Sequence, residues 1–304
     1  MDRNSLYYKQ VTLLIRALTF VAKENCFALK DGTAINLFVH NFPRLSVDID
    51  LAYLPLEDRT EALKNLKAAL RRIEDSINQE PDLSAILQDN RPDEMRIIIQ
   101  SSQAQVKIEV SPVARGTLHP PIELSVVESV EDEFGFASIQ VVSMADLYGG
   151  KLCAALDRQH PRDLFDVKIL LDTQDFNRDI FDGFITYLLS HNRPISEIMC
   201  PRWKDITGIY ETEFQGMTFK SVSIEELEAV PEKMMSTLKS HFTQRDFDFL
   251  KSVKEGTPNW SLAPNENIQN LPAVKWKLMN IQKIPRKKHK QALSKLEKIM
   301  LDWL

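Results

Sequence analysis

The polar and apolar residues that alternate from Ser46 to Leu51 constrain the fold more than any other feature of this sequence. Side chains two residues apart on a β-strand point to the same face of the sheet. A strand here therefore places Asp48 and Asp50 side by side, with the apolar side chains on the opposite face. Neighbouring carboxylates repel each other unless a cation lies between them, and Mg²⁺ prefers such oxygen ligands. The pattern predicts a strand that either binds a metal or faces solvent with two acids by chance.

A second segment, from Lys107 to Val110, repeats this alternation. Lys107 and Glu109 share one face of the expected strand, and the apolar side chains share the other. If the two strands are neighbours in one sheet, Glu109 completes a three-carboxylate metal site with Asp48 and Asp50. Three acids can hold two Mg²⁺ ions, which stabilise the attacking and leaving oxygens of a phosphoryl displacement. The alternative is an exposed pair between Lys107 and Glu109.

A short segment, Lys30 to Ala34, connects an expected strand to the start of an expected helix. Backbone N–H groups at such a helix start bind phosphate well. Gly32 allows close approach, and Thr33 offers a hydroxyl group. The Walker pattern GxxxxGK[ST] is absent, and an ordinary turn is the alternative interpretation.

The remaining patterns predict an α/β domain followed by a mostly helical one. Helical spacing occurs at residues 5–24, 33–38 and 58–78, and strand-like runs occur at 26–30, 46–54, 95–101, 105–111 and 139–143. The runs at 95–101 and 105–111 are close enough to form a hairpin. After residue 143 helical spacing dominates. We therefore expect an α/β domain with a small mixed sheet and flanking helices over residues 1–142, and a helical domain over residues 143–304.

Composition argues against several classes of protein. No apolar stretch approaches the ~18 residues of a membrane-spanning helix, and the first residues lack a secretory signal. The cysteines Cys26, Cys153 and Cys200 lie far apart, so they form no CxxC zinc or redox pair. The sequence has neither a GxSxG motif nor histidines at metal-ligand spacing, and its four tryptophans are expected to be packing residues. A cytoplasmic location is expected because sparse cysteines suit a reducing compartment.

Positive charge is concentrated at one end of the sequence. Residues 271–304 contain nine Lys and Arg residues and two acids, a net charge of +7, whereas residues 1–270 carry −12 and the whole chain −5. Such a basic segment can attract a polyanion such as RNA. An acidic partner protein or a merely solvated helix face are the alternatives.

Four motifs follow one another along the chain: FALKDGTAINLF, RLSVDIDL, VKIEV and LYGGKLCAALDRQHPRDLFDV. Together they resemble the AbiEii/AbiGii-type nucleotidyltransferase toxins of bacterial abortive-infection and toxin–antitoxin systems, in the polymerase-beta-like nucleotidyltransferase superfamily. The resemblance covers residues 10–175. It implies a Mg²⁺-dependent enzyme that transfers a nucleotide from an NTP, for example ATP, to an acceptor. It further implies RNA such as tRNA as the acceptor and a co-encoded antitoxin protein as a partner.

The resemblance also implies roles for individual residues. Asp48 and Asp50 would be catalytic Mg²⁺ ligands, beside Glu109 as the third candidate from the strand pattern. The residues expected to bind the nucleotide are Gly32, Thr33, Arg44, Ser46 and Lys151. The sequence departs from the family at Asp31, where the first of two glycines is usual.

The last motif contains Asp163 and Asp166, which share a helix face because they are three residues apart. The resemblance implies that Asp163 lies near the active site, as a catalytic residue together with Lys151. Asp166 would be a structural partner of Arg158 or Arg162. The alternative for this motif is a local ion-pair network without a catalytic role.

Two other functions fit the same motifs. The first is a non-catalytic module that binds RNA or protein on this fold, although such a module would be expected to have lost the three carboxylates. The second is a phosphotransferase that uses the same metal site on a protein acceptor. The labelled position of the NTP separates this second alternative from nucleotide transfer.

Overall fold

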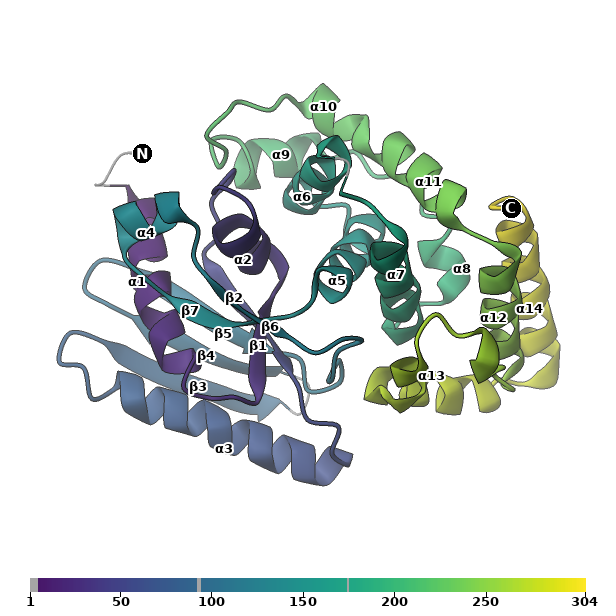
Figure 1. The fold of residues 1–304 in the computed structure, drawn as a ribbon, viewed down its shortest axis with the longest axis horizontal. Coiled ribbons are helices and arrows are strands. Elements are labelled where there is room, and N and C mark those ends of the chain that lie inside the picture. Colours follow the sequence, from purple (N-terminus) through teal and green to yellow (C-terminus); the bar gives the residue numbers. More distant parts are fainter. Residues whose placement is uncertain (1–4, 92–93, 174) are drawn as a thin grey trace. The chain divides into compact units, whose positions relative to one another are not determined.

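The computed structural model describes residues 5–91, 94–173 and 175–304, and the chain divides into two compact units (Figure 1). Unit 1 contains Met1–Ser143 together with Gly216–Lys220, and unit 2 contains Met144–Gln215 and Ser221–Leu304. The return of residues 216–220 to unit 1 is a feature that the sequence patterns did not reveal.

Unit 1 is built on a mixed sheet that has seven strands in the described part of the chain, in the order β3-β4-β5-β2-β1-β7-β6. The pairs β2–β5 and β1–β7 are parallel, and the other neighbouring strands are antiparallel. The strands are β1 Phe27–Lys30, β2 Asp48–Tyr53, β3 Ser84–Arg91, β4 Glu94–Gln100, β5 Gln105–Val110, β6 Ile122–Ser125 and β7 Ser138–Val141. The expected small mixed sheet is confirmed, including the hairpin of β4 and β5.

The two strands that the sequence patterns missed, β3 and β6, are the two edges of this sheet. An edge strand has a neighbour on one side only, so it needs less apolar surface than a central strand. The four residues of β6 are exposed or half-buried, and Ile86 on β3 is exposed. Strand β6 therefore buries no residue, and on β3 the alternation of exposed Ser84, buried Ala85 and exposed Ile86 puts an apolar side chain on the solvent side, unlike in β2 and β5.

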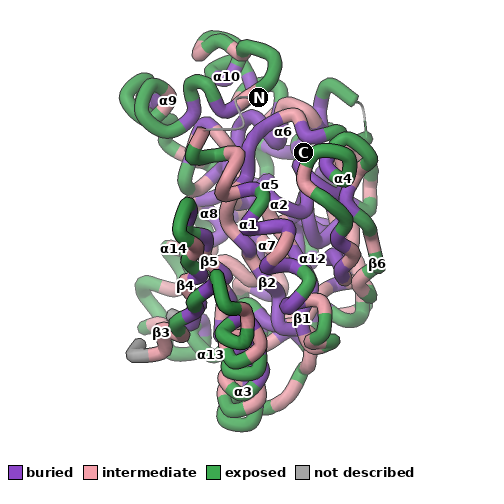
Figure 2. Tube along the Cα trace, turned by 90° about the vertical axis from the view of Figure 1, so that its left-hand side faces the viewer, coloured by how far each residue is buried: buried purple, intermediate pink, exposed green. Residues whose placement is uncertain are grey.

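Two long helices of unit 1, α1 (Leu6–Val21) and α3 (Arg59–Ile77), pack on the sheet and on each other. Each begins at a residue whose side chain accepts backbone N–H groups of the first turn, Ser5 for α1 and Asp58 for α3. Figure 2 shows buried chain along the central strands and an exposed outer side of α3. The other helices of this unit are α2 Asp31–Ala34, the π-helical turn η1 Ile35–Val39 and α4 Glu128–Phe134.

Unit 2 consists, in its described part, of helices joined by turns, which confirms the expected helical texture. Its α-helices are α5 Met144–Asp157, α6 Pro161–Asp172, α7 Arg178–Ser190, α8 Ile195–Ile198, α9 Thr207–Glu213, α10 Ile224–Glu228, α11 Val230–His241, α12 Gln244–Glu255, α13 Pro272–Gln282 and α14 Arg286–Leu301. Two 3-10 turns, η2 Trp260–Leu262 and η3 Glu266–Asn270, precede α13. No helix in the described ranges combines the length and the apolar character needed to cross a membrane.

Glycines bring α5 and α7 into unusually close contact. A Cβ added to Gly149 of α5 would overlap the backbone of Gly183 on α7, and one added to Gly183 would overlap the backbone of Ala145. Because neither glycine has a side chain, the two helix backbones touch directly. This contact fixes the position of α5, the helix that carries Lys151.

Candidate functional site

The parallel pairing of β2 and β5 brings the predicted carboxylates together in unit 1. Asp50 lies beside Glu109 in the register, and Asp48 lies beside Lys107. Residues paired across two strands point to the same face, so all four side chains share one face of the sheet. The intervening apolar residues, among them Ile49 and Ile108, are fully buried on the other side. The prediction that these two strands are neighbours is confirmed.

Lys107 lies between two of the carboxylates. Its Nζ is 3.2 Å from Oε2 of Glu109 and 3.8 Å from Oδ1 of Asp48. The side chains of all three residues are 32–37% exposed, so water and small ions can reach them. The expected pair between Lys107 and Glu109 therefore exists alongside the carboxylate cluster.

Negative charge is in excess around Asp50. Burial, together with the nearby carboxylates of Asp31, Asp48 and Glu109, raises the pKa of Asp50 to about 6, and the Lys30 ammonium opposes this shift. Oxygen donors of this kind match the preference of Mg²⁺. Among the residues that the structure describes, however, no three acidic, histidine or cysteine side chains form a preassembled metal cluster. A cation would thus have to draw these carboxylates together.

The segment after β1 turns sharply into α2. Asp31 has a φ of +63°, in the left-handed region where glycine is the usual residue. Aspartate and asparagine are among the few other residues that occupy this region readily. This explains how Asp31 can replace the glycine that is usual in the family. The helix expected from residue 33 begins two residues earlier and continues as η1.

Gly32 allows a close approach, and the group that approaches is Arg44. A Cβ at Gly32 would lie 2.6 Å from Nη2 of Arg44 and 3.1 Å from Oγ of Ser46. The Arg44 side chain is almost completely buried, and its Nη1 donates to the carbonyl oxygen of Leu45 at 2.7 Å. The structure therefore places a guanidinium group directly beside the start of α2.

Hydroxyl groups connect α2 to the beginning of β2. Oγ1 of Thr33 donates to the carbonyl oxygen of Asp48 at 2.5 Å and lies 2.9 Å from Oγ of Ser46. A hydroxyl group has one proton, so Ser46 is the donor in the contact with Thr33. Both residues are buried. In this arrangement they hold Asp48 in place rather than direct their protons outwards.

The segment 216–220 completes unit 1 next to Arg44. The backbone N–H of Leu45 donates to the carbonyl oxygen of Met217 at 2.8 Å, and Arg44 forms an isolated antiparallel bridge with Thr218. Sequence reasoning missed this contact because the two segments are far apart in the chain and 216–220 carries no strand-like alternation.

In unit 2, Lys151 forms a buried cluster with the acids of the last motif. Its Nζ is 2.9 Å from Oδ1 of Asp163 and 3.1 Å from Oδ2 of Asp166, and each of the three residues is at most 3% exposed. Arg158 also contacts Oδ1 of Asp163, at 3.0 Å. The Oδ2 atom of Asp163 is buried and accepts no hydrogen bond from the described residues. Asp166 thus pairs with Lys151, which was not among its expected partners, while Arg162 contacts Glu213 at 3.7 Å.

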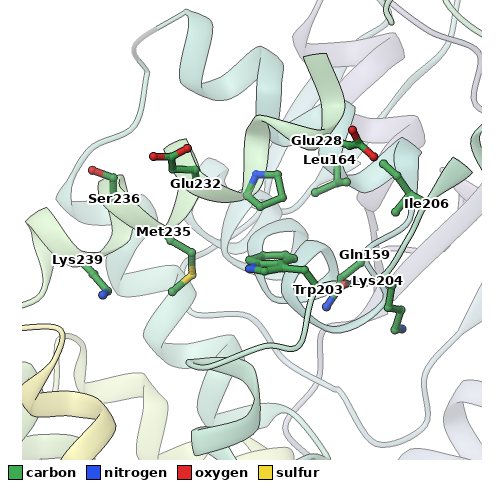
Figure 3. A pocket seen from close by; sticks show the side chains of 11 residues that line it. Gln159, Leu164, Trp203, Lys204, Ile206, Glu228, Glu232, Met235, Ser236 and Lys239 are labelled. Carbon is green, nitrogen blue, oxygen red and sulfur yellow. Dashed lines mark hydrogen bonds between the residues drawn. The ribbon is translucent and has the colours of Figure 1, made fainter. Parts of the chain in front are cut away.

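Unit 2 also contains a pocket of about 730 Å³ next to Trp203. The Trp203 side chain is 44% exposed, so the expectation that it packs in the core is wrong. In Figure 3, Met235 lies on one side of Trp203, and Gln159 and Lys204 lie on the other. The lining residues are Gln159, Leu164, Trp203, Lys204, Ile206, Glu228, Pro231, Glu232, Met235, Ser236 and Lys239.

The side chain of Gln159 forms hydrogen bonds with the backbone of the residues before and after Trp203. Its Nε2 donates to the carbonyl oxygen of Arg202 at 2.9 Å, and its Oε1 accepts from the backbone N–H of Lys204 at 2.8 Å. Gln159 is buried and has a φ of +57°, an uncommon conformation for a residue with a side chain. The pocket therefore has one wall that is fixed by hydrogen bonds.

Comparisons with known proteins agree with the motifs. The profile of the AbiEii family, described as "Nucleotidyl transferase AbiEii toxin, Type IV TA system", matches residues 12–280. Among solved structures, the fold is similar to MenT4, a nucleotidyltransferase toxin from Mycobacterium tuberculosis H37Rv. The TM-score is 0.57 at 14% sequence identity, over 94% of this chain and 92% of that chain. No curated protein matches the sequence closely enough to serve as a relative.

The family match spans most of both units and includes every motif on which the resemblance rested. The likeness to MenT4 adds support for the fold alone. The chain therefore belongs to the AbiEii family of nucleotidyltransferase toxins of type IV toxin–antitoxin systems.

Proposed function

We propose that this protein transfers a nucleotide from an NTP to RNA, with Asp48, Asp50 and Glu109 as Mg²⁺ ligands. The observation that carries the proposal is the parallel register of β2 and β5, which sets Asp50 beside Glu109 on an accessible face of the sheet. The family match supplies the class of reaction.

The residues present fit a divalent cation. Three carboxylates offer hard oxygen ligands, and the pKa of Asp50 is raised first by burial and then by neighbouring carboxylates, whose charge a cation would offset. Lys107 now lies between Asp48 and Glu109, and its side chain is exposed and flexible enough to move aside. When bound, Mg²⁺ would activate the acceptor oxygen and offset the charge of the departing pyrophosphate.

The residues around α2 suit the phosphates of the nucleotide. We propose that Gly32 admits the triphosphate to the backbone N–H groups of this segment, and that Arg44 beside it supplies positive charge. Thr33 and Ser46 support the same site by fixing Asp48 through their hydroxyl groups.

Lys151 and Asp163 are proposed to take part in catalysis, as the resemblance implies. Two features of their cluster support this role. The Lys151 ammonium is rigidly placed by two carboxylates, and the Oδ2 atom of Asp163 retains the capacity to accept a proton or a hydrogen bond. A purely structural ion-pair network is the competing explanation.

The proposal extends to partners, location and domains. RNA, in particular tRNA, is the proposed acceptor because the basic segment 271–304 can neutralise phosphates. A co-encoded antitoxin follows from the toxin–antitoxin family, and the cytoplasm is the proposed location because NTPs and RNA are both present there.

We also propose that residues 1–142 form the nucleotidyltransferase domain and residues 143–304 the helical domain, apart from the segment that returns to unit 1.

The test is incubation of the full chain with total RNA, MgCl₂ and each NTP labelled in turn at the α- or γ-phosphate. Nucleotide transfer attaches α-label, and no γ-label, to an RNA band on a denaturing gel. The control is Asp48→Asn, which removes one ligand charge without changing the size of the side chain.

Each alternative function gives a different result in this assay. A phosphotransferase would place γ-label on protein, whereas a non-catalytic module would bind RNA without transferring label. Either pattern, seen with the wild-type protein in place of α-label on RNA, would contradict nucleotide transfer to RNA.

A further inference from the structure

Helices α13 and α14 and the turn between them expose a group of cations for which the described part of the chain provides no ion-pair partner. Among the residues that the structure describes, none of these side chains forms an ion pair, and all of them are exposed. In the rest of the chain, by contrast, Arg16, Arg72 and Arg193 each contact a carboxylate. We call the group the α13–α14 cationic surface; its members are Lys275, Lys283, Arg286, Lys287, Lys288, Lys290, Lys295 and Lys298.

The way in which α14 packs keeps these cations in solvent. Leu296 and Met300 are buried, and Nε2 of His289 lies 2.7 Å from the carbonyl oxygen of Lys254 on α12. These three residues form one stripe along the helix because they recur at intervals of one or two turns. Lys287 and Lys298 lie on the opposite side, so docking on α12 leaves the cationic side outward.

The charges are not explained by the stability of the helix. The first turn of α14 has no acidic residue and its N-cap, Pro285, provides no side-chain cap. Cations at this end of a helix oppose the helix dipole. Only two acids occur in the segment, and one of them, Glu297, is engaged with Lys251. The surface therefore carries an uncompensated charge that a polyanion would neutralise.

Helix α13 also exposes an aromatic side chain. Trp276 on α13 is 49% exposed, next in sequence to Lys275, so the expectation that it is a packing residue is wrong. An exposed indole offers a face on which an unpaired base can stack, irrespective of the base sequence. A base inside a duplex is already stacked on its neighbours and cannot use this face.

We infer that the α13–α14 cationic surface binds single-stranded RNA, with its cations on the phosphates and Trp276 stacked on a base. The inference rests on the proposed function and assigns a surface to the RNA acceptor. RNA fits better than an acidic protein because seven of the eight cations are lysines, which are depleted from protein–protein interfaces. Protein interfaces with nucleic acids, in contrast, are strongly enriched in positive charge.

The inference is tested by fluorescence anisotropy with the full chain and a 5′-labelled 20-nucleotide RNA of unstructured sequence, over a series of salt concentrations. The variant replaces Lys287, Lys288 and Lys290 with Gln. Each lost phosphate contact changes the slope of log K against log salt by about 0.7 for single strands. We therefore expect the slope to flatten by about 2 and the affinity at 0.1 M salt to fall about 100-fold.

The matched control makes the same change of charge elsewhere. Arg59, Lys64 and Arg71 are exposed cations on α3, and replacing all three with Gln should leave the slope unchanged. Trp276→Ala should lower the affinity for single-stranded RNA about 5- to 150-fold without altering the slope, and should leave binding of a duplex unchanged. Unchanged thermal melting confirms that these exposed substitutions do not unfold the chain.

Three results would overturn the inference. They are wild-type affinity in the α14 triple variant, an equal loss in the α3 triple variant, and displacement of the RNA by polyglutamate at equal charge concentration. This last result would indicate an acidic protein partner. Failure of the proposed function is recognised separately, because it appears as absent α-label transfer to RNA while the binding results stay as expected.

Discussion

Two lysine–carboxylate clusters, one in each unit, contain the same kinds of side chain and differ in their access to water. In unit 1, Lys107 contacts Asp48 and Glu109, and each of the three is about one-third exposed. In unit 2, Lys151 contacts Asp163 and Asp166, and the cluster is almost completely buried. The first lysine can be replaced by a metal ion at little cost. Removal of Lys151, in contrast, would leave the buried carboxylates of Asp163 and Asp166 without a cation and away from water.

The difference in burial corresponds to two roles that ion pairs have in proteins. An exposed ion pair contributes about 0–1 kcal/mol to stability, so evolution can assemble one around a ligand site without a large effect on folding. Removing one partner from a buried pair costs about 3–5 kcal/mol, so the same side chains then fix the structure. Burial, more than residue type, therefore decides which cluster can exchange its cation.

The largest effect is expected for the activity that depends on the open cluster. Asp48→Asn should reduce nucleotide transfer at least about 10³-fold, equivalent to about 4 kcal/mol, because the proposed Mg²⁺ ligand loses its charge. The free energy of unfolding should not fall, since the open cluster contributes little to stability. Incorporation of α-labelled nucleotide and urea denaturation measure the two quantities. A variant that loses stability and activity together would contradict the assignment of Asp48 to the exchangeable cluster.

The next largest effect concerns the stability of the buried cluster. Lys151→Met should lower the free energy of unfolding by about 3–5 kcal/mol, because Asp163 and Asp166 then lose their buried ammonium partner. Lys107→Met is the matched control and should change it by less than about 1 kcal/mol. Urea denaturation of both variants provides the comparison. Equal losses in the two variants would remove the distinction between the clusters.

A smaller change in the free energy of unfolding, a gain rather than a loss, is expected when Asp50 is replaced. Its pKa is raised to about 6 in the folded chain from an ordinary value of 3.8, so the ionised form disfavours folding. Asp50→Asn should therefore raise the free energy of unfolding by about 1–2 kcal/mol above pH 7, in the absence of Mg²⁺. The gain should disappear at about pH 3 and below, where Asp50 is protonated in both states. A gain that is independent of pH would show that ionisation of the buried Asp50 carboxyl is not its cause.

The smallest effect on stability is expected for a third lysine, Lys277. Nζ of Lys277 donates to the carbonyl oxygens of Leu188 and Arg193, at 3.3 and 3.0 Å, and burial lowers its pKa to about 8. No carboxylate pairs with it among the described residues. Because the unfolded chain binds the proton more tightly, stability should rise as the pH increases from about 8 to 10. Relative to Lys277→Met, we expect a gain of about 1 kcal/mol over this range by urea denaturation; a flat difference would contradict it.

The central part of the fold and the pairing of the carboxylates could be predicted from the sequence. Ile49 and Ile108 are apolar residues between charged ones, and that alternation fixes which side of each strand is buried. The edge strands β3 and β6 escaped prediction because edges require no such pattern. The partner of Asp166 escaped it because the distance between Lys151 and Asp166 depends on how α5 and α6 pack, which a single sequence does not encode locally.

Because residues 216–220 belong to unit 1, that unit cannot finish folding during synthesis until this later segment has been added. Unit 1 is translated first, yet the backbone partner of Leu45 is Met217, which is added ~70 residues after Ser143. At ordinary rates of synthesis this delay lasts roughly 4–15 s. During that interval the nascent chain holds its seven strands without the segment that covers Arg44. A chain arranged in this way keeps the surroundings of Arg44 incomplete until most of the polypeptide exists, and a fragment that ends at residue 143 should expose that incomplete edge to proteases.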